Sequence, residues 1–213
     1  QVAALTTDQI AAMATRQIAA FETADLNAMT TDQIEAFTTR QIGALTTGQL
    51  SHLATEQLMA IETDDIEALK AGQLQSFTTS QIQSLTTDQL ASLLAKQMAA
   101  LGTAQLASLQ TGQVEAFSTS QLAALRTKQF QSLTSDQIAA LLTEQVQGLT
   151  KSNLSALTSG QATSFTTDQI AALTGAQIAA LKTSTIAVLT TEQVNALSED
   201  QVVAMTSQEI RAL

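Results

Sequence analysis

Large apolar residues recur every eight residues along the whole chain. From Leu5 the sequence falls into 26 consecutive octads, which end at Ala212 and contain no insertion. With the positions of an octad lettered a to h, the consensus is Leu-Thr-Thr-x-Gln-Ile-x-Ala. Position a is Leu, Met, Phe or Ile, position f is always apolar, and position h is small except for His52 and Val188. Such a fixed period indicates an array of one small structural unit.

Neither a continuous helix nor an ordinary strand suits this period. A helix turns about 100° per residue, so each octad would lie about 80° out of phase with the one before, and the apolar positions would spiral around it. A strand alternates every two residues, which would put position a on the opposite face from f and h. Ala, Gln and Leu are also weak strand formers. A β-solenoid remains the alternative to a helical array.

One short helix per octad uses every fixed position. A Thr at b or c can cap the helix N-terminus, and Thr at b with Gln at e has the spacing of a capping box. Asp or Glu at d, as in Asp8 and Asp88, suits the positive end of the helix dipole. A helix of about six or seven residues, roughly 10 Å long, is too short to be stable alone. The sequence therefore predicts an all-α solenoid or superhelix of very short stacked helices, with a and f in a narrow core and small h residues at the contacts.

Two positions of the octad have more than one interpretation. Position c is Thr or Ser in 21 octads and position b in 15, so c is either the true cap or is held in another way. Gln occupies e in 21 octads, which suggests a ladder of Gln side chains that hydrogen-bonds one coil to the next. The exceptions at e all keep a side-chain oxygen, as a required acceptor would; they are Asp25, Asp65, Asn153, Thr185 and Glu209.

The composition argues against several classes of function. The formal net charge is −10, and the nine basic residues stand singly along the sequence, whereas a phosphate-binding surface needs clustered Lys and Arg. We therefore expect no nucleic-acid partner and no membrane insertion, and we interpret the acidic surplus as an aid to solubility that keeps neighbouring copies apart. The absence of cysteine excludes disulfides, thiol catalysis and Cys-based metal sites.

Few residues suggest chemistry. The single histidine, His52, replaces Ala at position h, and no Ser/His/Asp set can be built around it. The densest acidic patch joins Asp64 and Asp65 to Glu62 and Glu67. A calcium site there is the alternative to solvent-facing acids at a helix N-terminus, but no calcium-loop motif accompanies it. We assign no catalytic, cofactor-binding or metal-binding residue, expect no cofactor, and predict that the chain is not an enzyme.

Two resemblances follow from the octads themselves. The segment Thr-Thr-Asp-Gln-Ile-Ala-Ala, at residues 6–12 and 166–172, resembles the "LTTxQIxAL" repeat tracts of very large bacterial secreted proteins, which are described as adhesin-like, haem-utilisation-like or RTX-associated. This resemblance covers the whole chain and implies an extracellular or surface stalk. Leu-Thr-Thr-Glu-Gln-Val-Asn-Ala-Leu, at residues 189–197, resembles the first helix of a TAL-effector repeat. The period of eight and the acidic charge differ from that family, so no DNA binding is carried over.

These observations lead to one expectation for organisation and function. Residues 1–213 should form one uninterrupted octad array with both ends inside an octad, either cut from a longer array or stacked end to end as a subunit. We expect a non-enzymatic structural segment, which serves as a stalk, spacer or fibre-forming region of a large bacterial surface or secreted protein. Its expected location is extracellular or on the cell surface, and its expected partners are itself or other surface proteins. The alternative is a protein-binding α-solenoid scaffold that presents its variable positions d and g.

Overall fold

A computed structural model describes all residues of the chain, Gln1 to Leu213, and places one short helix in every octad. No strand occurs, so the predicted all-α fold is confirmed and the β-solenoid alternative is wrong. The chain consists of two compact units, Gln1–Leu109 and Gln110–Leu213, called unit 1 and unit 2 below. The octad frame continues through Leu109 and Gln110 without a break in the sequence.

The helices of unit 1 are four to six residues long and follow a single 3-10 turn at the N-terminus. They are η1 (Val2–Ala4), α1 (Thr7–Ala11), α2 (Thr15–Ile18), α3 (Thr23–Asn27), α4 (Thr31–Glu35), α5 (Thr39–Ile42), α6 (Thr47–His52), α7 (Thr55–Met59), α8 (Thr63–Glu67), α9 (Ala71–Gln75), α10 (Thr79–Ser84), α11 (Thr87–Ser92), α12 (Ala95–Met98) and α13 (Thr103–Ser108). These lengths fall below the six or seven residues expected, because the residues at a and b between helices are extended.

The helices of unit 2 have the same lengths and spacing as those of unit 1. They are α14 (Thr111–Glu115), α15 (Thr119–Ala123), α16 (Thr127–Gln131), α17 (Ser135–Ala139), α18 (Thr143–Gln147), α19 (Lys151–Ala156), α20 (Ser159–Ser164), α21 (Thr167–Ala172), α22 (Gly175–Ile178), α23 (Thr183–Ile186), α24 (Thr191–Asn195), α25 (Glu199–Ala204) and α26 (Ser207–Ile210).

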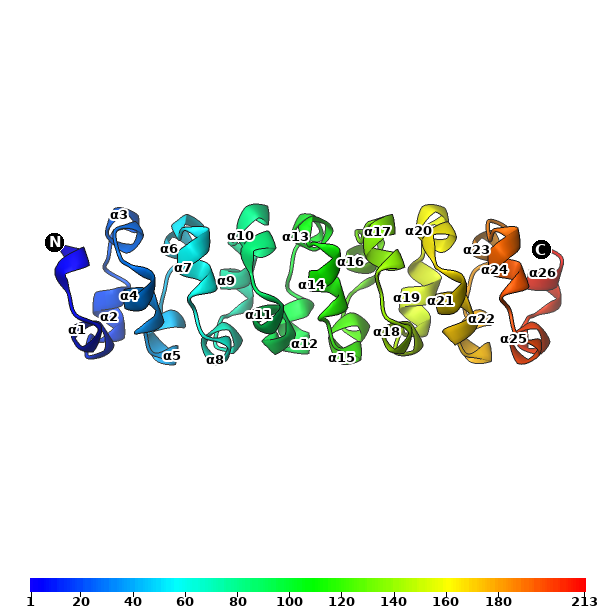
Figure 1. The fold of residues 1–213 in the computed structure, drawn as a ribbon, viewed down its shortest axis with the longest axis horizontal. Coiled ribbons are helices and arrows are strands. Elements are labelled where there is room, and N and C mark those ends of the chain that lie inside the picture. The colour runs from blue at the N-terminus through cyan, green and yellow to red at the C-terminus, as the bar shows by residue number, and fades with distance from the viewer. The chain divides into compact units, whose positions relative to one another are not determined.

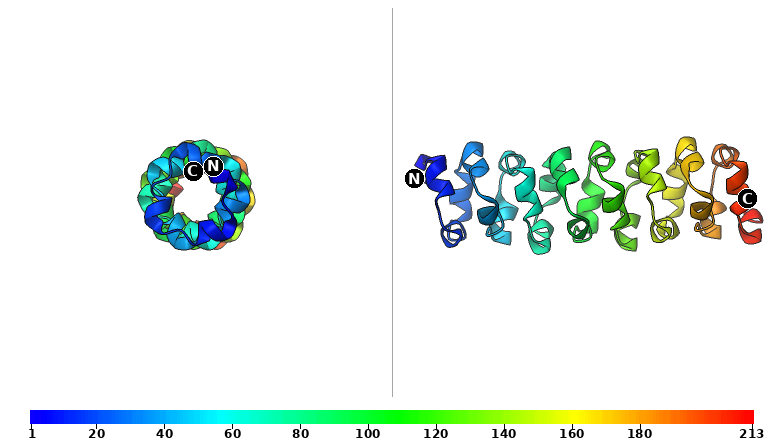
Figure 2. Two further views of the ribbon diagram at one scale, coloured as in Figure 1. Left: turned by 90° about the vertical axis from the view of Figure 1, so that its left-hand side faces the viewer. Right: turned by 90° about the horizontal axis from the view of Figure 1, so that it is seen from below.

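Within each unit the chain winds as a coil of stacked turns. Each helix packs against the third helix along the chain, for example α1 against α4 and α10 against α13 in unit 1, or α16 against α19 in unit 2. In unit 1, α1, α5, α8 and α12 lie along one edge of the coil, while α3, α6 and α10 lie along the other (Figure 1). The view along the coil axis shows the helices of unit 1 arranged in a ring (Figure 2). One turn therefore takes between three and four octads.

The N-terminus of each helix is capped at position b. The Thr6 hydroxyl accepts a hydrogen bond from the Gln9 backbone N–H at 3.2 Å, and the Gln9 Oε1 accepts one from the Thr6 N–H at 2.8 Å. Where b lacks a hydroxyl, as at Ala14, the Gln half of the box remains, with Gln17 Oε1 2.8 Å from the Ala14 nitrogen. The backbone N–H of the residue at b donates to this side-chain oxygen, so it does not donate to a carbonyl of the preceding helix and does not extend that helix. Position b is thus the cap, and position c is the first helical residue.

The core consists of the side chains at f and a, as predicted. Residues at f from Ile10 to Ile186 are at most 2% exposed, and those at a from Met29 to Leu181 are at most 7% exposed. The two positions are three residues apart along each helix and its C-terminal end, so they face the same side. The side chains of successive turns thus line the interior of each coil.

From Gln33 onward the residue at position e is at most 7% exposed, and Gln at this position links each turn to the one before. In unit 1 the Gln41 Nε2 donates to the carbonyl oxygens of Ile10 and Met13, each at 2.8 Å. In unit 2 the Gln169 Nε2 donates to Ile138 at 2.9 Å and to Leu141 at 2.6 Å. The acceptors lie 31 and 28 residues earlier in the chain, so one turn takes about 28 residues.

The same Gln side chain therefore satisfies the ends of two different helices. Its Oε1 caps the N-terminus of its own helix, and its Nε2 binds two carbonyls at the C-terminal end of the fourth helix back. The Ile10 carbonyl also accepts a bond from the Met13 amide, so the Gln amide is its second donor. The expected hydrogen bonding by Gln from one coil to the next is confirmed, and its acceptors are backbone carbonyls. Each Gln bonds to backbone, because backbone amides and carbonyls are the groups that burial would otherwise leave unpaired.

Positions c and h meet across successive turns. A methyl group on Gly148 would lie 2.6 Å from the Cβ of Thr119, and one on Gly175 would lie 2.8 Å from the Cβ of Ala204. The Ser92 hydroxyl at h donates to the carbonyl of Thr63 at c, at 3.3 Å, and h lies 29 residues after c in this pair. This contact explains both the small residues at h, as predicted, and the frequent Thr at c, whose methyl group fills the space beside them.

Long polar side chains at g add a further bond between turns. In unit 1 the Gln75 Nε2 donates to the Ala100 carbonyl at 2.9 Å, and the Gln83 Nε2 to that of Ser108 at 2.8 Å. In unit 2 Gln131 binds the Ala156 carbonyl in the same way. These bonds run forward by 25 residues, whereas those of e run backward. Position g is thus free to vary, and where it is Gln it strengthens the stack.

Replacing Ile138 with Asp should open the coil of unit 2 locally, because a carboxylate without a partner would enter the core at a cost of several kcal/mol. Ile138 is fully buried, whereas the neighbouring Ala139 at g is partly exposed, so Ala139→Asp should change stability little. Urea denaturation followed by circular dichroism measures both. Equal destabilisation by the two variants would show that the faces are assigned wrongly.

Replacing Gln169 with Glu should keep the N-terminal cap but place a charged acceptor against the carbonyls of Ile138 and Leu141. We expect a loss of roughly 3 kcal/mol at pH 7, since a charged group is left buried and without a donor. Gln9→Glu is the matched control, because Gln9 is exposed and makes the same cap. A thermal melt of both variants tests this, and similar melting temperatures would contradict the bridging role of Gln169.

Candidate interaction surface

The residues singled out by sequence for chemistry do not form a reactive group. His52 is exposed, with its Nδ1 2.8 Å from the Gly48 carbonyl and 3.2 Å from the Ser51 hydroxyl. No three or more His, Asp or Glu side chains gather in an arrangement that could hold a metal ion. None of the helices has the length and apolar character needed to cross a membrane.

The acidic patch of α8 divides into exposed and buried carboxylates. Glu62, Asp64 and Glu67 are exposed, whereas Asp65 at position e is only 5% exposed. Burial raises the pKa of Asp65, the hydrogen bond from Thr39 opposes that rise, and the charges of Glu62 and Asp64 add to it. Asp65 stands where Gln donates in other octads, but an ionised carboxylate has no proton to donate. It is therefore a weak place in the stack of unit 1.

Unit 2 has a second irregularity in its interior. Ala162 is the smallest residue at f and Thr185 replaces Gln at e, and both line a small apolar void of about 10 Å³. A void of that size holds at most about one water molecule, and its walls offer that water few polar partners. It is a packing defect between short side chains rather than a ligand site.

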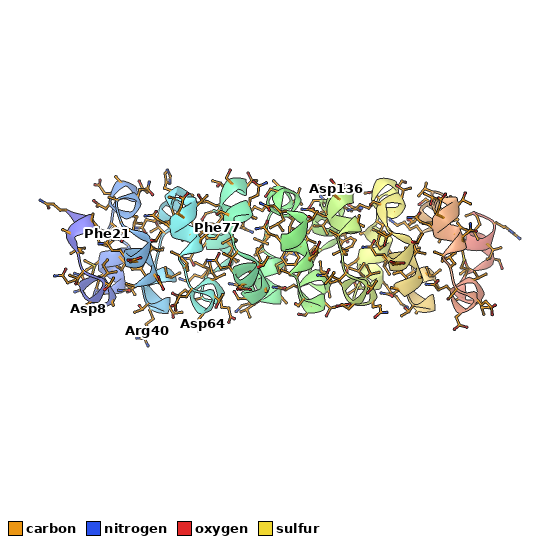
Figure 3. The ribbon with its side chains drawn as sticks, in the orientation of Figure 1. Asp8, Phe21, Arg40, Asp64, Phe77 and Asp136 are labelled. Carbon is orange, nitrogen blue, oxygen red and sulfur yellow. The ribbon has the colours of Figure 1, made fainter.

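The basic residues of unit 1 form a stripe along one side of the coil. Arg16, Arg40, Lys70 and Lys96 are all exposed, and each follows the one before after close to one turn of the chain. Successive members therefore lie on neighbouring turns at nearly the same place, and we call them the basic stripe. The Lys70 Nζ donates to the Gly43 carbonyl of the preceding turn at 3.2 Å. Lys70 and Lys96 also line one surface groove of about 340 Å³. Arg40 projects outward from the coil, while Phe77 lies inside it (Figure 3).

Unit 2 carries a basic stripe of the same kind. Arg126, Lys151, Lys182 and Arg211 are exposed and again follow one another after close to one turn, with Lys128 beside the first. Lys151 and Lys182 line a groove of about 330 Å³ on neighbouring turns. All nine basic residues of the chain thus belong to these two stripes.

Eight exposed acidic residues follow the same period on a different sector of the coil, whereas the exposed Glu67 lines the same groove as Lys70 and Lys96 of the basic stripe. In unit 1, Asp8, Glu35, Glu62 and Asp88 are exposed and lie about one turn apart, and we call them the acidic stripe. In unit 2, Glu115, Glu144, Asp168 and Glu199 recur in the same way. A basic residue follows each member of the acidic stripe of unit 1 after five to eight residues, which is about a quarter of a turn.

Three exposed large apolar side chains stand near these charges, and four more lie between Val202 and Leu213. In unit 1 they are Met59, 44% exposed and three residues before Glu62, and Leu94, 38% exposed and two residues before Lys96. In unit 2, Leu142 is 43% exposed and stands two residues before Glu144. Apolar side chains bordered by charges are typical of a surface that binds another macromolecule.

Sequence reasoning missed this surface because the basic residues stand singly when counted along the chain. Their regular spacing was visible, but it has meaning only when the length of a turn is known. No octad position marks them either, since Arg16 and Arg40 are at d, Lys70 and Lys182 at b, and Arg211 at g.

A family model of the ALTTAQ repeat matches residues 18–55, 58–94, 95–127, 119–151 and 175–207, which together cover more than half of the chain. The chain belongs to the ALTTAQ repeat family. Two of the matched ranges contain complete contacts between turns, since Gln49 binds the carbonyls of Ile18 and Phe21, and Gln89 those of Leu58 and Ile61. The ALTTAQ repeat is thus long enough to hold one turn together with the Gln that closes it. Comparison with curated proteins gave no match.

Replacing Asp65 with Gln should restore the usual ALTTAQ octad and stabilise the chain at pH 7 by roughly 1–3 kcal/mol, since Gln supplies the missing donor. The raised pKa means that the folded chain holds the Asp65 proton more tightly than the unfolded chain, in which the pKa is near 3.8. Wild-type stability therefore falls as pH rises from about that value to the raised one, and the advantage of the variant should shrink below it. Thermal melts from pH 3 to pH 7 test this. Glu67→Gln, at an exposed site whose charge does not contribute to the shift of Asp65, should differ from the wild type by the same amount at every pH. An equal pH dependence of both differences would contradict the assignment to Asp65.

Proposed function

We propose that this chain is a non-enzymatic structural segment, which acts as a stalk, spacer or fibre-forming region of a large bacterial surface or secreted protein. The observation that supports this is the uniform contact between turns. In both units Gln reaches the carbonyls 28 and 31 residues before it, so each turn is held by its neighbour and not by a distant part of the chain. An array of this kind can gain or lose turns without a change in its fold.

The extracellular or surface location and the adhesin-like or RTX-associated context are part of this proposal. They rest on the resemblance of the octads to the repeat tracts of very large secreted proteins. Antibodies against residues 1–213, used with intact and with permeabilised cells that carry the parent protein, test the location. Labelling of intact cells would support it, and labelling only after permeabilisation would contradict it.

The second candidate function is a protein-binding scaffold, and the one-sided stripes of charge favour it. A spacer requires only the core and the contacts between turns, whereas a scaffold requires particular residues at b, c, d and g. The two functions thus make different demands on the same octads.

An exchange of surface residues separates them. In the parent protein, residues 5–212 are replaced by 26 copies of Leu-Thr-Thr-Asp-Gln-Ile-Ala-Ala, the octad that residues 5–12 already have. A spacer should keep the activity of the parent protein, because core, caps and length are unchanged. Loss of that activity in a variant with normal helical content would favour the scaffold. Removal of seven whole octads is the control for length, and a spacer should be sensitive to it.

A further inference from the structure

The two stripes of unit 1 lie on one face of the coil. Arg40, Lys70 and Lys96 follow Glu35, Glu62 and Asp88 after five, eight and eight residues, which is about a quarter of a turn. Leu94 lies between Asp88 and Lys96 on this face and is exposed. By contrast Ala24, Ser80 and Ala104 are exposed on the far side of the coil, where no basic residue occurs.

The charges on this face repeat with the turn of the coil. Neighbouring members of a stripe are separated by one packed layer of helices, about 10 Å. A surface that complements both stripes needs opposite charges with the same repeat. A second copy of the chain has that repeat automatically, because its turns are the same. A simple polyanion would match the basic stripe only, and the acidic stripe a quarter of a turn away would repel it.

We infer that two copies of this chain associate side by side and in the same direction, with the basic stripe of each copy against the acidic stripe of the other. A two-fold axis parallel to the coils produces this arrangement, since the order acidic then basic around one coil meets basic then acidic on the facing coil. Copies in opposite directions would bring like charges together. The contact is isologous, so it joins two chains and closes.

The details of the face suit this contact. On this face the groove beside Lys70 and Lys96 brings two ammonium groups together with one carboxylate, that of Glu67, which leaves one positive charge in excess for a carboxylate of the other copy. Single exposed ion pairs contribute little, but a row of them also excludes wrong registers. Leu94 lies near the two-fold axis and would meet its own copy, which adds an apolar contact to the rows of charge. The inference concerns the isolated chain and does not depend on the proposed role as a spacer.

Sedimentation velocity at about 20 mM and 500 mM salt tests the association of residues 1–213. We expect dimers at low salt, where the close pairing of the stripes outweighs the general repulsion between two chains of net charge −10. We expect monomers at high salt, because screening shortens the range of the charges from roughly 20 Å to less than about 5 Å. A chain that stays monomeric at every concentration and salt level would overturn the inference.

Two matched variants test the stripe. The first neutralises it by Arg40→Gln, Lys70→Gln and Lys96→Gln. The second adds the same negative charge on the far side by Ala24→Glu, Ser80→Glu and Ala104→Glu. The first should weaken association at least tenfold, and the second should change it by less than threefold. Circular dichroism verifies that both remain folded, and equal weakening would show a net-charge effect and contradict the inference.

A charge exchange then identifies the partner stripe. Arg40→Glu, Lys70→Glu and Lys96→Glu make both stripes acidic, while Glu35→Lys, Glu62→Lys and Asp88→Lys make both basic. Each triple variant alone should be monomeric, and their mixture should restore the dimer. Failure of the folded mixture to associate would overturn the pairing.

Direction is tested by cross-linking. The Leu94→Cys variant should form a disulfide-linked dimer at low salt, whereas the Ala24→Cys variant, half a turn away, should not. Absence of the Leu94→Cys dimer would contradict the parallel arrangement, and equal cross-linking of both variants would contradict the assigned face. Fluorescence anisotropy with labelled polyphosphate tests the alternative that a polyanion, and not a second copy of the chain, binds the basic stripe. Tight binding to a chain that does not self-associate would assign the basic stripe to a polyanion instead.

Discussion

The fold depends on one side-chain amide that bonds at both of its ends. A helix of four to six residues has almost as many unpaired backbone groups as paired ones, so burial of such helices requires other partners for their amides and carbonyls. Gln at position e supplies them in both directions, with Oε1 on its own helix and Nε2 on the helix of the previous turn. Asn153 shows that one bond to the previous turn is sufficient, since its shorter side chain bonds to that turn only at the Leu125 carbonyl, at 3.2 Å. Apolar burial at f and a stabilises the stack, but the helix ends can be buried only because the side-chain amide at e bonds to their backbone N–H and C=O groups.

Sequence patterns were sufficient for the parts of this structure that lie within one octad. The helix and the apolar faces f and a follow from local spacing, because each involves residues only three or four apart. The choice between b and c as the cap stayed open until the structure showed the Thr6 hydroxyl at b on the Gln9 amide. The contacts between turns were predicted in kind but not in detail. Nothing within an octad shows that Gln41 reaches Ile10, because that distance depends on how sharply the chain bends between helices. The basic and acidic stripes were missed for the same reason, because they can be recognised only when the number of residues per turn is known and positions one turn apart are compared.

Exceptions to the octad show how strongly each position is required. Asp65 and Thr185 both replace Gln, and each leaves a local defect, a buried carboxyl in unit 1 and a void in unit 2. Neither defect spreads, because each turn contacts only its neighbours. Substitutions at d and g cause no such defects, since these side chains lie outside the core. Charge can therefore be placed there freely, and its regular placement on one side is a property of the surface alone.

The length of the turn limits which gains and losses of octads leave both the interior and the surface of such an array unchanged. Eight does not divide 28, so an octad occupies about two-sevenths of a turn, and seven octads complete two turns. After the loss of a single octad, the remaining octads could still form the same kinds of hydrogen bond and core contact with new partners. It would nevertheless rotate all later residues by more than a quarter of a turn around the coil and carry their stripes to another side. Only gains or losses of seven octads preserve both the interior and the direction in which the surface faces. The interior is thus preserved when any whole octad of eight residues is gained or lost, whereas the direction of the surface is preserved only by changes of 56 residues.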